Sequence, residues 1–304
     1  MAYDCVVCIK YVPDTKKVTG EAMKADGTVN RAALPMIYNP EDLNALELAL
    51  AVRDAHGGSV TVITMGAPAA TEILRDSLCR GADAAVLLTD RRAAASDTLA
   101  TSYILSRAVK LLPHDLVICG RQAIDGDTAQ VGPQLAEKLG LTQITYLEAL
   151  EGLEGGTIRA RRNLGNGFEV VEAQLPALVT VMDTANVPRP PAARRIMKYK
   201  KARSRPEVAA AVAAEMGEDA DKDAVAAEVE RRCQGLAGKG LLIEAWDLER
   251  VGADLAFCGR NGSPTKVHKI LSVVLTGGEY KEVPATDEGV AELVGELIQE
   301  HTIG

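Results

Sequence analysis

The sequence predicts an α/β fold built on a doubly wound parallel sheet with a small antiparallel addition and a C-terminal arm. Over the first 145 residues, short apolar runs alternate with helical patterns of 12–16 residues. The apolar runs are continuous, which is typical of strands buried on both faces of a parallel sheet. Helical segments between such strands favour right-handed crossovers and a layer of helices on each face.

Each of these elements has a local signal. Strands are predicted at residues 5–12, 59–66, 84–90 and 114–120, and helices at residues 41–56, 69–80, 96–111 and 128–139. Pro68 precedes the second helix, where a missing N–H costs little, and Gly81 follows it. The four strand-to-helix junctions are therefore expected on one edge of the sheet.

After residue 145 the pattern changes. Shorter strands are predicted at residues 156–162, 167–175 and 177–182, as the small antiparallel addition. Prolines exclude a regular helix at the start of the Arg-rich stretch 188–205. The Ala- and Glu-rich stretch 206–238 predicts one or two exposed helices or a flexible insertion, and a last helix is predicted near residues 288–301. The predicted division is an α/β domain at 1–187, a loop with a helical insertion at 188–240 and a C-terminal arm at 241–304.

Composition excludes several classes of protein. The chain has 304 residues, 47% of them hydrophobic and 25% charged, as in ordinary globular proteins. A net charge of −8 argues against a broad nucleic-acid-binding face, and 3% aromatic residues argue against stacking platforms. The absence of an 18-residue apolar run or a leader-like N-terminus predicts a cytoplasmic protein without a membrane span.

The cysteines and histidines predict no metal site. Six cysteines are scattered along the chain and four histidines are dispersed. Cys5 and Cys8 have CxxC spacing, but on a strand their side chains would face opposite sides.

The fourth junction, residues 119–133, is the most informative. Ligands of doubly wound sheets bind beyond the carboxyl ends of the strands, near helix N-termini. Gly126 would allow a tight turn, Arg121 a fixed positive charge and Gln130 an amide donor. With Asp127 or Thr128 as the helix cap, the N–H groups of residues 128–131 would be available to a pyrophosphate. The alternative is that Asp125 and Asp127 serve only as caps and Gly126 only as a turn residue.

The third junction, residues 89–98, leaves the same choice open. Ser96 or Asp97 would cap a helix, and the hydroxyls of Thr98 and Thr101 could contact a nucleotide or be structural. Neither a GxGxxG fingerprint nor a P-loop is present. The basic run at residues 194–205 is either a solvated loop or a docking segment for an acidic partner.

Taken together, these residues resemble the small (beta) subunit of electron-transfer flavoproteins. The resemblance rests on KYVPDT (10–15), NPEDLNALELAL (39–50), VTVITMG (60–66), LRDSLCRGAD (74–83), SDTLATS (96–102), CGRQAIDGDTAQVGPQLAEKLGL (119–141) and LPALVTV (175–181). It covers the chain except for about residues 206–238.

The resemblance implies an adenine nucleotide hydrolase-like, Rossmann-like fold and a heterodimer with a larger alpha subunit. Ordinary members hold a structural AMP, whereas electron-bifurcating members hold a second FAD that takes hydride from NADH. The small residues at 125–133, with 64–66 and 96–98, resemble the bifurcating group, so FAD is predicted. Electrons would then go to the alpha-subunit FAD and to a low-potential acceptor such as ferredoxin or flavodoxin.

Two alternatives remain. One is a conventional beta subunit that holds AMP while electrons pass between a dehydrogenase and a quinone reductase. The other is a nucleotide-binding regulatory protein of the same fold without electron transfer. The bifurcating mechanism would need no acid–base side chain, because the flavin carries the chemistry.

The resemblance also assigns binding residues. Cys8, Asn39, Asp42 and Met65 match contacts to adenosine, and residues 125–132 match the phosphate loop. Asp90, Arg91, Asp97, Thr98 and Thr101 would flank the flavin. The full predicted set is Cys8, Asn39, Asp42, Met65, Gly66, Asp90, Arg91, Asp97, Thr98, Thr101, Arg121, Gln122, Asp125, Gly126, Asp127, Thr128, Ala129, Gln130, Val131 and Gly132.

The sequence departs from the family at its partner-docking segment. Ala193 stands where a bulky aliphatic residue usually precedes the Ile-Met-Lys run at 196–198. This departure argues against docking to an ordinary acyl-CoA dehydrogenase, so the expected partner is an acyl-CoA dehydrogenase-like or other flavoenzyme. The segment 241–304 is expected to pack on the alpha subunit, and the resemblance does not explain the insertion at 206–238.

Overall fold

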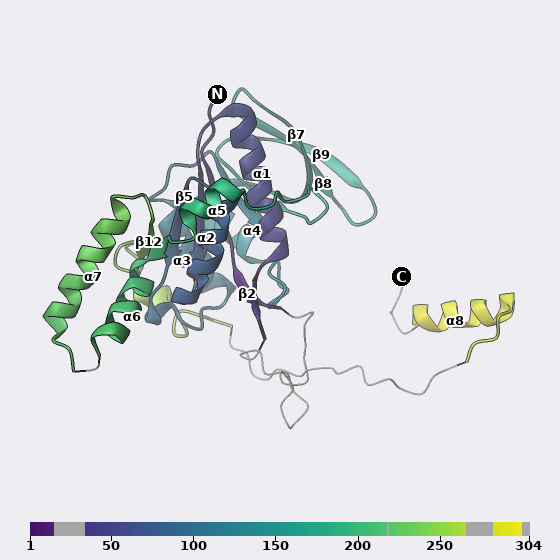
Figure 1. The fold of residues 1–304 in the computed structure, drawn as a ribbon. Helices are drawn as coiled ribbons and strands as arrows, with labels where there is room; N and C mark the ends of the chain where they lie inside the picture. Colours follow the sequence, from purple (N-terminus) through teal and green to yellow (C-terminus); the bar gives the residue numbers. More distant parts are fainter. Residues whose placement is uncertain (15–33, 218, 266–281, 300–304) are drawn as a thin grey trace.

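A computed structural model describes residues 1–14, 34–217, 219–265 and 282–299 (Figure 1). Its core is a ten-stranded sheet in the order β11-β12-β5-β4-β1-β6-β10-β7-β8-β9. The strands are β1 (Cys5–Cys8), β4 (Val60–Met65), β5 (Ala84–Leu88), β6 (Leu116–Gly120), β7 (Thr142–Glu154), β8 (Thr157–Asn163), β9 (Phe168–Gln174), β10 (Ala177–Val181), β11 (Arg203–Ser204) and β12 (Leu242–Trp246). Neighbours from β11 to β7 are parallel, whereas β8 and β9 are antiparallel. The predicted parallel sheet is confirmed.

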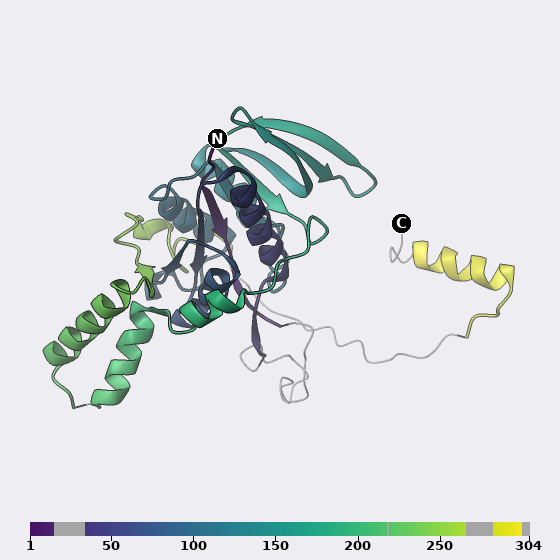
Figure 2. The same cartoon turned by 45° about the horizontal axis from the view of Figure 1, so that its top comes forward.

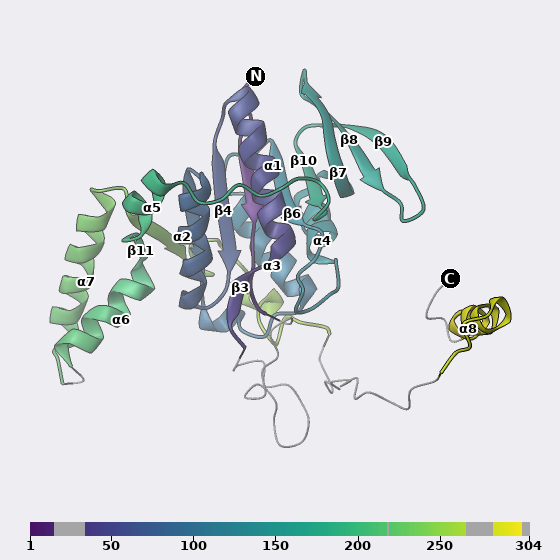
Figure 3. The same ribbon diagram turned by 45° about the vertical axis from the view of Figure 1, so that its right-hand side comes forward.

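Helices cover both faces of this sheet (Figure 3). They are α1 (Pro40–His56), α2 (Thr71–Arg80), α3 (Thr98–Val109) and α4 (Val131–Leu139). The buried residues of α1 and α2 form one core with Cys5 and Val7 of β1, and those of α3 and α4 form a second core with Val6 and Cys8. Alternate residues of β1 thus face opposite cores, which confirms the doubly wound arrangement and the opposite directions expected of Cys5 and Cys8.

Several predicted strands need correction. The strand predicted at residues 5–12 is interrupted, because β1 ends at Cys8 and β2 (Tyr11–Pro13) pairs antiparallel with β3 (Met36–Tyr38). β10, predicted as part of the antiparallel addition, is a parallel strand between β6 and β7. β7 was not predicted, and with β8 and β9 it forms the antiparallel extension.

The later part of the chain adds helices and two further strands. These helices are α5 (Ala193–Tyr199), α6 (Arg205–Met216), α7 (Lys222–Ala237) and α8 (Asp287–Gln299). α6 and α7 share a small core of Val208, Val212, Val229 and Cys233, so the predicted insertion is a pair of helices. Figure 2 shows this pair, in green, at one end of the sheet and the β7–β9 extension, in teal, at the other.

β11 belongs to the predicted insertion at 188–240 and β12 to the predicted arm at 241–304, yet both are strands of the main sheet. β12 pairs with β5, although it begins the segment predicted as a C-terminal arm. The division into three domains stays a prediction.

Residues 300 and 301 of the predicted last helix lie outside the described residues. None of the helices in the described ranges is both long and apolar enough to cross a membrane.

Candidate functional site

A cavity of about 710 Å³ opens at the carboxyl ends of β1, β4, β5 and β6. The chain runs outward from β1 through β4 to β5 and then returns to β6 on the other side of β1. Such a reversal leaves a crevice between the diverging connections, where ligands bind in open α/β sheets. The volume lies within the range of small-molecule and cofactor sites.

All but two of the predicted binding residues line this cavity; the exceptions are Asn39 and Asp125. Their roles in binding stay predictions. The cavity is also lined by residues that were not predicted: Ile9, Lys10, Ala67, Pro68, Leu88, Thr89, Ala93, Ala94, Ala95, Ser96, Leu105, Cys119, Gly120 and Ala123. Most of them are in the same four junctions, so their position after a strand was the available signal.

The first turn of α1 holds the loop that follows β6. Asn39 donates from Nδ2 to the Gln122 carbonyl (2.9 Å) and accepts from the Ile124 N–H (3.1 Å). Glu41 accepts from the Gln122 N–H (2.8 Å) and pairs with Arg121 (2.9 Å). We call Asn39, Glu41 and Asp42 the α1 clamp. Asn39 therefore does not line the cavity itself but holds the loop that forms part of its wall.

Asp42 joins the ends of β1 and β6. Its carboxylate accepts from the backbone N–H of Lys10 (2.7 Å) and of Gly120 (3.2 Å). Burial raises the pKa of this carboxyl to about 7, although these two hydrogen bonds and one from Asn39 act in the opposite direction.

Asp42→Asn is expected to remove a pH dependence of stability. The folded chain keeps the Asp42 proton up to about pH 7, whereas an unfolded Asp releases it near pH 3.9. The wild-type free energy of unfolding should therefore fall between pH 4 and 7, relative to the variant, by up to about 1.4 kcal/mol per pH unit. Urea unfolding of both nucleotide-depleted proteins at several pH values measures this. If the free energies of unfolding of the two proteins ran parallel across this pH range, the raised pKa of Asp42 would be contradicted. The amide oxygen of Asn replaces only one of the two acceptors, and loss of the other backbone hydrogen bond gives only a constant offset.

The loop before α4 offers unused backbone donors. α4 begins at Val131 rather than at the predicted residue 128, and its N-cap, Gln130, makes no side-chain capping bond. In the part of the chain that the structure describes, the N–H groups of residues 128–132 donate to no protein acceptor. An open helix N-terminus with a run of free N–H groups suits an anionic ligand.

Gly126 lies in a turn at residues 124–126, but the left-handed backbone comes after it. Asp127 (φ 52°) and Ala129 (φ 51°) have left-handed backbone, whereas Gly126 does not have positive φ. A Cβ on Gly126 would meet nothing within 4 Å. The turn is present as predicted, but it does not use the backbone freedom of glycine at Gly126. The expectation that Asp127 or Thr128 caps α4 is wrong, because the N-cap is Gln130. Asp127 and Ala129 both adopt a conformation that is uncommon outside glycine, and Asp127 Oδ1 accepts from Gln122 Nε2.

The loop after β5 forms the other end of the cavity. Asp90 caps a short 3₁₀ turn (Arg91–Ala93) by accepting from the Arg92 N–H (2.8 Å). Hydrogen bonds from the Arg92 side chain lower the pKa of Asp90 to about 2. Arg91 is exposed and lines the cavity, and it forms no ion pair with any carboxylate in the described ranges.

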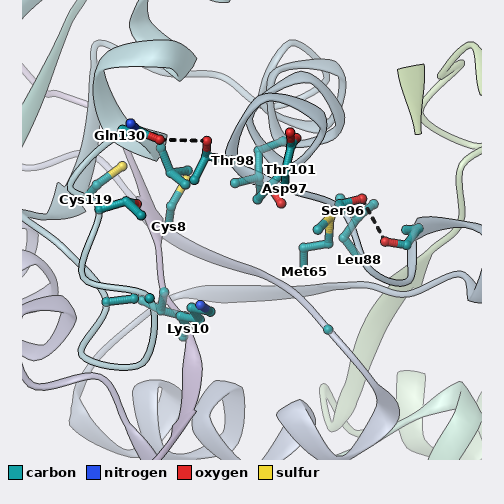
Figure 4. Close-up of a pocket in the computed structure, with 18 of the residues that line it drawn as sticks. Cys8, Lys10, Met65, Leu88, Ser96, Asp97, Thr98, Thr101, Cys119 and Gln130 are labelled. Atoms are coloured by element: carbon teal, nitrogen blue, oxygen red, sulfur yellow. Dashed lines mark hydrogen bonds between the residues drawn. The ribbon is translucent and has the colours of Figure 1, made fainter. Parts of the chain in front are cut away.

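A hydrogen bond at the cavity wall joins the N-terminus of α3 to the N-cap of α4. Asp97 caps α3 by accepting from the Ala100 N–H (2.9 Å), as predicted for Ser96 or Asp97. The Thr98 hydroxyl donates to Gln130 Oε1 (2.9 Å), which joins α3 to the loop before α4 (Figure 4). Lys10, at the end of β1, pairs with Asp125 (2.7 Å) and so ties the first junction to the fourth.

Among the described residues, no group of three or more Cys, His, Asp or Glu side chains is arranged to hold a metal ion. The donor set of the cavity consists of backbone N–H groups, hydroxyls and a few cationic side chains. Such donors suit phosphate and ribose groups.

Comparison with known proteins supports a family assignment. The electron transfer flavoprotein domain matches residues 26–215. The chain is 40% identical to the electron transfer flavoprotein subunit beta of Clostridium acetobutylicum over 98% of this chain and 99% of that protein. It is 37% identical to the caffeyl-CoA reductase-Etf complex subunit CarD of Acetobacterium woodii, over 98% and 99% of the two chains. It is 46% identical to the acryloyl-CoA reductase electron transfer subunit gamma of Anaerotignum propionicum, over 60% and 69%. The chain therefore belongs to the electron transfer flavoprotein family, among its beta subunits.

Proposed function

We propose that the cavity at the carboxyl edge binds FAD, and that the chain transfers electrons as the beta subunit of a bifurcating heterodimer. One observation carries the choice of FAD over AMP. The cavity does not end at the loop before α4 but continues to Thr89–Ser96 after β5. An AMP at the phosphate-binding loop would leave that second part without a ligand group, whereas a dinucleotide has a second half to fill it.

The residues present fit the parts of FAD. The N–H groups of residues 128–132 and the N-terminus of α4 would hold the pyrophosphate. Arg91 would add a positive charge at the opposite wall. Cys8 and Met65 would lie against adenosine, and Asp97, Thr98 and Thr101 would flank the flavin. These assignments follow the resemblance of the sequence to the family.

A flavin bound here would accept a hydride from NADH and release its electrons to the alpha-subunit FAD and to an acceptor such as ferredoxin or flavodoxin. The chain itself supplies position and electrostatics. The α1 clamp fixes the loop before α4, and the Thr98–Gln130 hydrogen bond fixes its distance from α3. Asp90 is an anion at neutral pH, since its pKa is about 2.

The names of two relatives guide the choice of partner. One is called a subunit of a caffeyl-CoA reductase-Etf complex and the other an electron transfer subunit of acryloyl-CoA reductase. By analogy, we infer that this chain pairs with an alpha subunit and exchanges electrons with an acyl-CoA-reducing or acyl-CoA-oxidising flavoenzyme.

Arg91→Ala is expected to weaken FAD binding about tenfold, as expected for the loss of a charge-assisted hydrogen bond. Arg92→Ala is the matched control, because Arg92 pairs with Asp90 and Glu249 and does not line the cavity. Titration of FAD and AMP into the nucleotide-depleted protein, followed by flavin fluorescence and by competition, gives both affinities. Saturable FAD binding that AMP displaces only at higher concentration supports the proposal. Tight AMP binding that FAD cannot displace overturns it.

A further inference from the structure

Two cysteines meet at the inner end of the cavity, and nothing in the proposed electron transfer uses their thiols. Cys8 is the last residue of β1, and its register partner on β6 is Cys119. Both side chains belong to the same core cluster and therefore lie on the same face of the sheet. Both line the cavity, with exposed fractions of 8% and 6%, and Figure 4 shows them at one end of it.

The two cysteines stand at paired positions of adjacent strands. Neighbouring strands lie about 4.8 Å apart, so in-register side chains on one face are within reach of a single bridging atom. A hydrogen bond with the Cys8 thiol, together with burial, raises the pKa of Cys119 well above its ordinary value. Cys119 is therefore a neutral thiol at neutral pH and reacts poorly with reagents that need a single thiolate.

The other cysteines have no such arrangement. Cys5 lies on the opposite face of β1, in the other core. Cys79 is in α2, Cys233 is in α7 and Cys258 follows a 3₁₀ turn, and all are buried and free. Among the described residues, the Cys8–Cys119 pair alone joins two thiols at the wall of the main cavity.

We propose that Cys8 and Cys119 form a dithiol site for a thiophilic centre that bridges two sulfurs, of which trivalent arsenic is the representative. With an aryl arsenic(III) oxide, two S–H bonds break and two As–S bonds form. The arsenic-bound oxygen leaves with both protons as water, and no atom changes oxidation state. The bridged group occupies the inner end of the cavity, so thiol modification and nucleotide loading exclude one another. That exclusion, but not the dithiol site, rests on the proposed function.

The test uses the full nucleotide-depleted chain and phenylarsine oxide. After a wash with excess monothiol, intact mass spectrometry should show one adduct per chain, which dithiothreitol removes. Cys8→Ser and Cys119→Ser should each reduce the adduct at least tenfold, because a single thiol does not hold the arsenical against excess monothiol. Cys5→Ser, on the same strand but the opposite face, should retain it. Absence of the adduct in the wild type, or its persistence in both pair variants, overturns the proposal.

Peptide mapping of the wild-type protein tests the site without any substitution. After adduct formation the chain is unfolded and alkylated at acidic pH, and Cys8 and Cys119 should be the protected pair. Protection of any other pair contradicts the proposal even where a variant fails to fold.

Preincubation with FAD separates this inference from the proposed function. Saturating FAD should slow adduct formation at least tenfold. An adduct that maps to Cys8 and Cys119 but forms equally fast with FAD present would leave the dithiol site standing. The same result would count against the proposal that FAD binds in this cavity.

Discussion

Gly120→Ala is expected to destabilise the chain by about 3 kcal/mol and to abolish nucleotide retention. Gly120 ends β6 directly against the first turn of α1. A Cβ there would lie 2.8 Å from the Glu41 carbonyl carbon and 2.9 Å from the Asp42 backbone N, and closer still to Asp42 Oδ1. Two of these atoms are backbone, so α1 must move away from β6, and the α1 clamp moves with it.

Gly126→Ala is the matched control for this effect. It lies in the same connection, but its Cβ would meet nothing within 4 Å and its backbone does not have positive φ. Its free energy of unfolding should change by less than about 0.5 kcal/mol. Urea unfolding and nucleotide content of the two purified variants are the measurements. Equal losses in both variants would show that the close approach at Gly120 is not what holds the loop.

Glu41→Ala should cost about 2 kcal/mol of stability and weaken nucleotide binding at least tenfold. Glu41 is buried and holds both the Arg121 guanidinium and the Gln122 N–H. Removing it leaves a partly exposed charge and a backbone donor without their acceptor, and the loop before α4 loses an anchor.

The control for Glu41→Ala is an exposed ion pair. Glu172 pairs with Arg159 at 3.3 Å, and both side chains are more than half exposed (60% and 54%). Glu172→Ala should therefore change stability by less than about 0.5 kcal/mol and leave binding unchanged. Denaturant melts and nucleotide titrations of both variants test this. If Glu41→Ala kept wild-type nucleotide affinity, the clamp would have no role in shaping the cavity.

The parallel core could be predicted because its signal is local. β6 is a continuous apolar run and β4 is interrupted only by Thr61 and Thr64, and both strands are buried along nearly their whole length. β7 was missed because much of its surface is half-buried or exposed and it carries three glutamates. β12 was missed for a different reason: it is held by pairing with β5, far away in the sequence.

The location of the site could also be predicted, but not its internal support. Strand ends place the junction residues at one edge whatever their side chains do. The contacts of the α1 clamp instead join residues about 80 positions apart, such as Glu41 to Gln122 and Asn39 to Ile124. No local pattern reports such pairs. Left-handed backbone at Asp127 and Ala129 was equally hidden, since glycine is the residue expected there.

The most direct test of the central claim is the nucleotide content of the purified heterodimer. The chain is co-expressed with its alpha subunit, the complex is denatured, and released FAD and AMP are quantified by chromatography. FAD at one equivalent per beta subunit beyond that of the alpha subunit, without AMP, is the predicted result. Stoichiometric AMP, with FAD only at the level of the alpha subunit, would contradict the account and leave this chain a scaffold for electron transfer elsewhere.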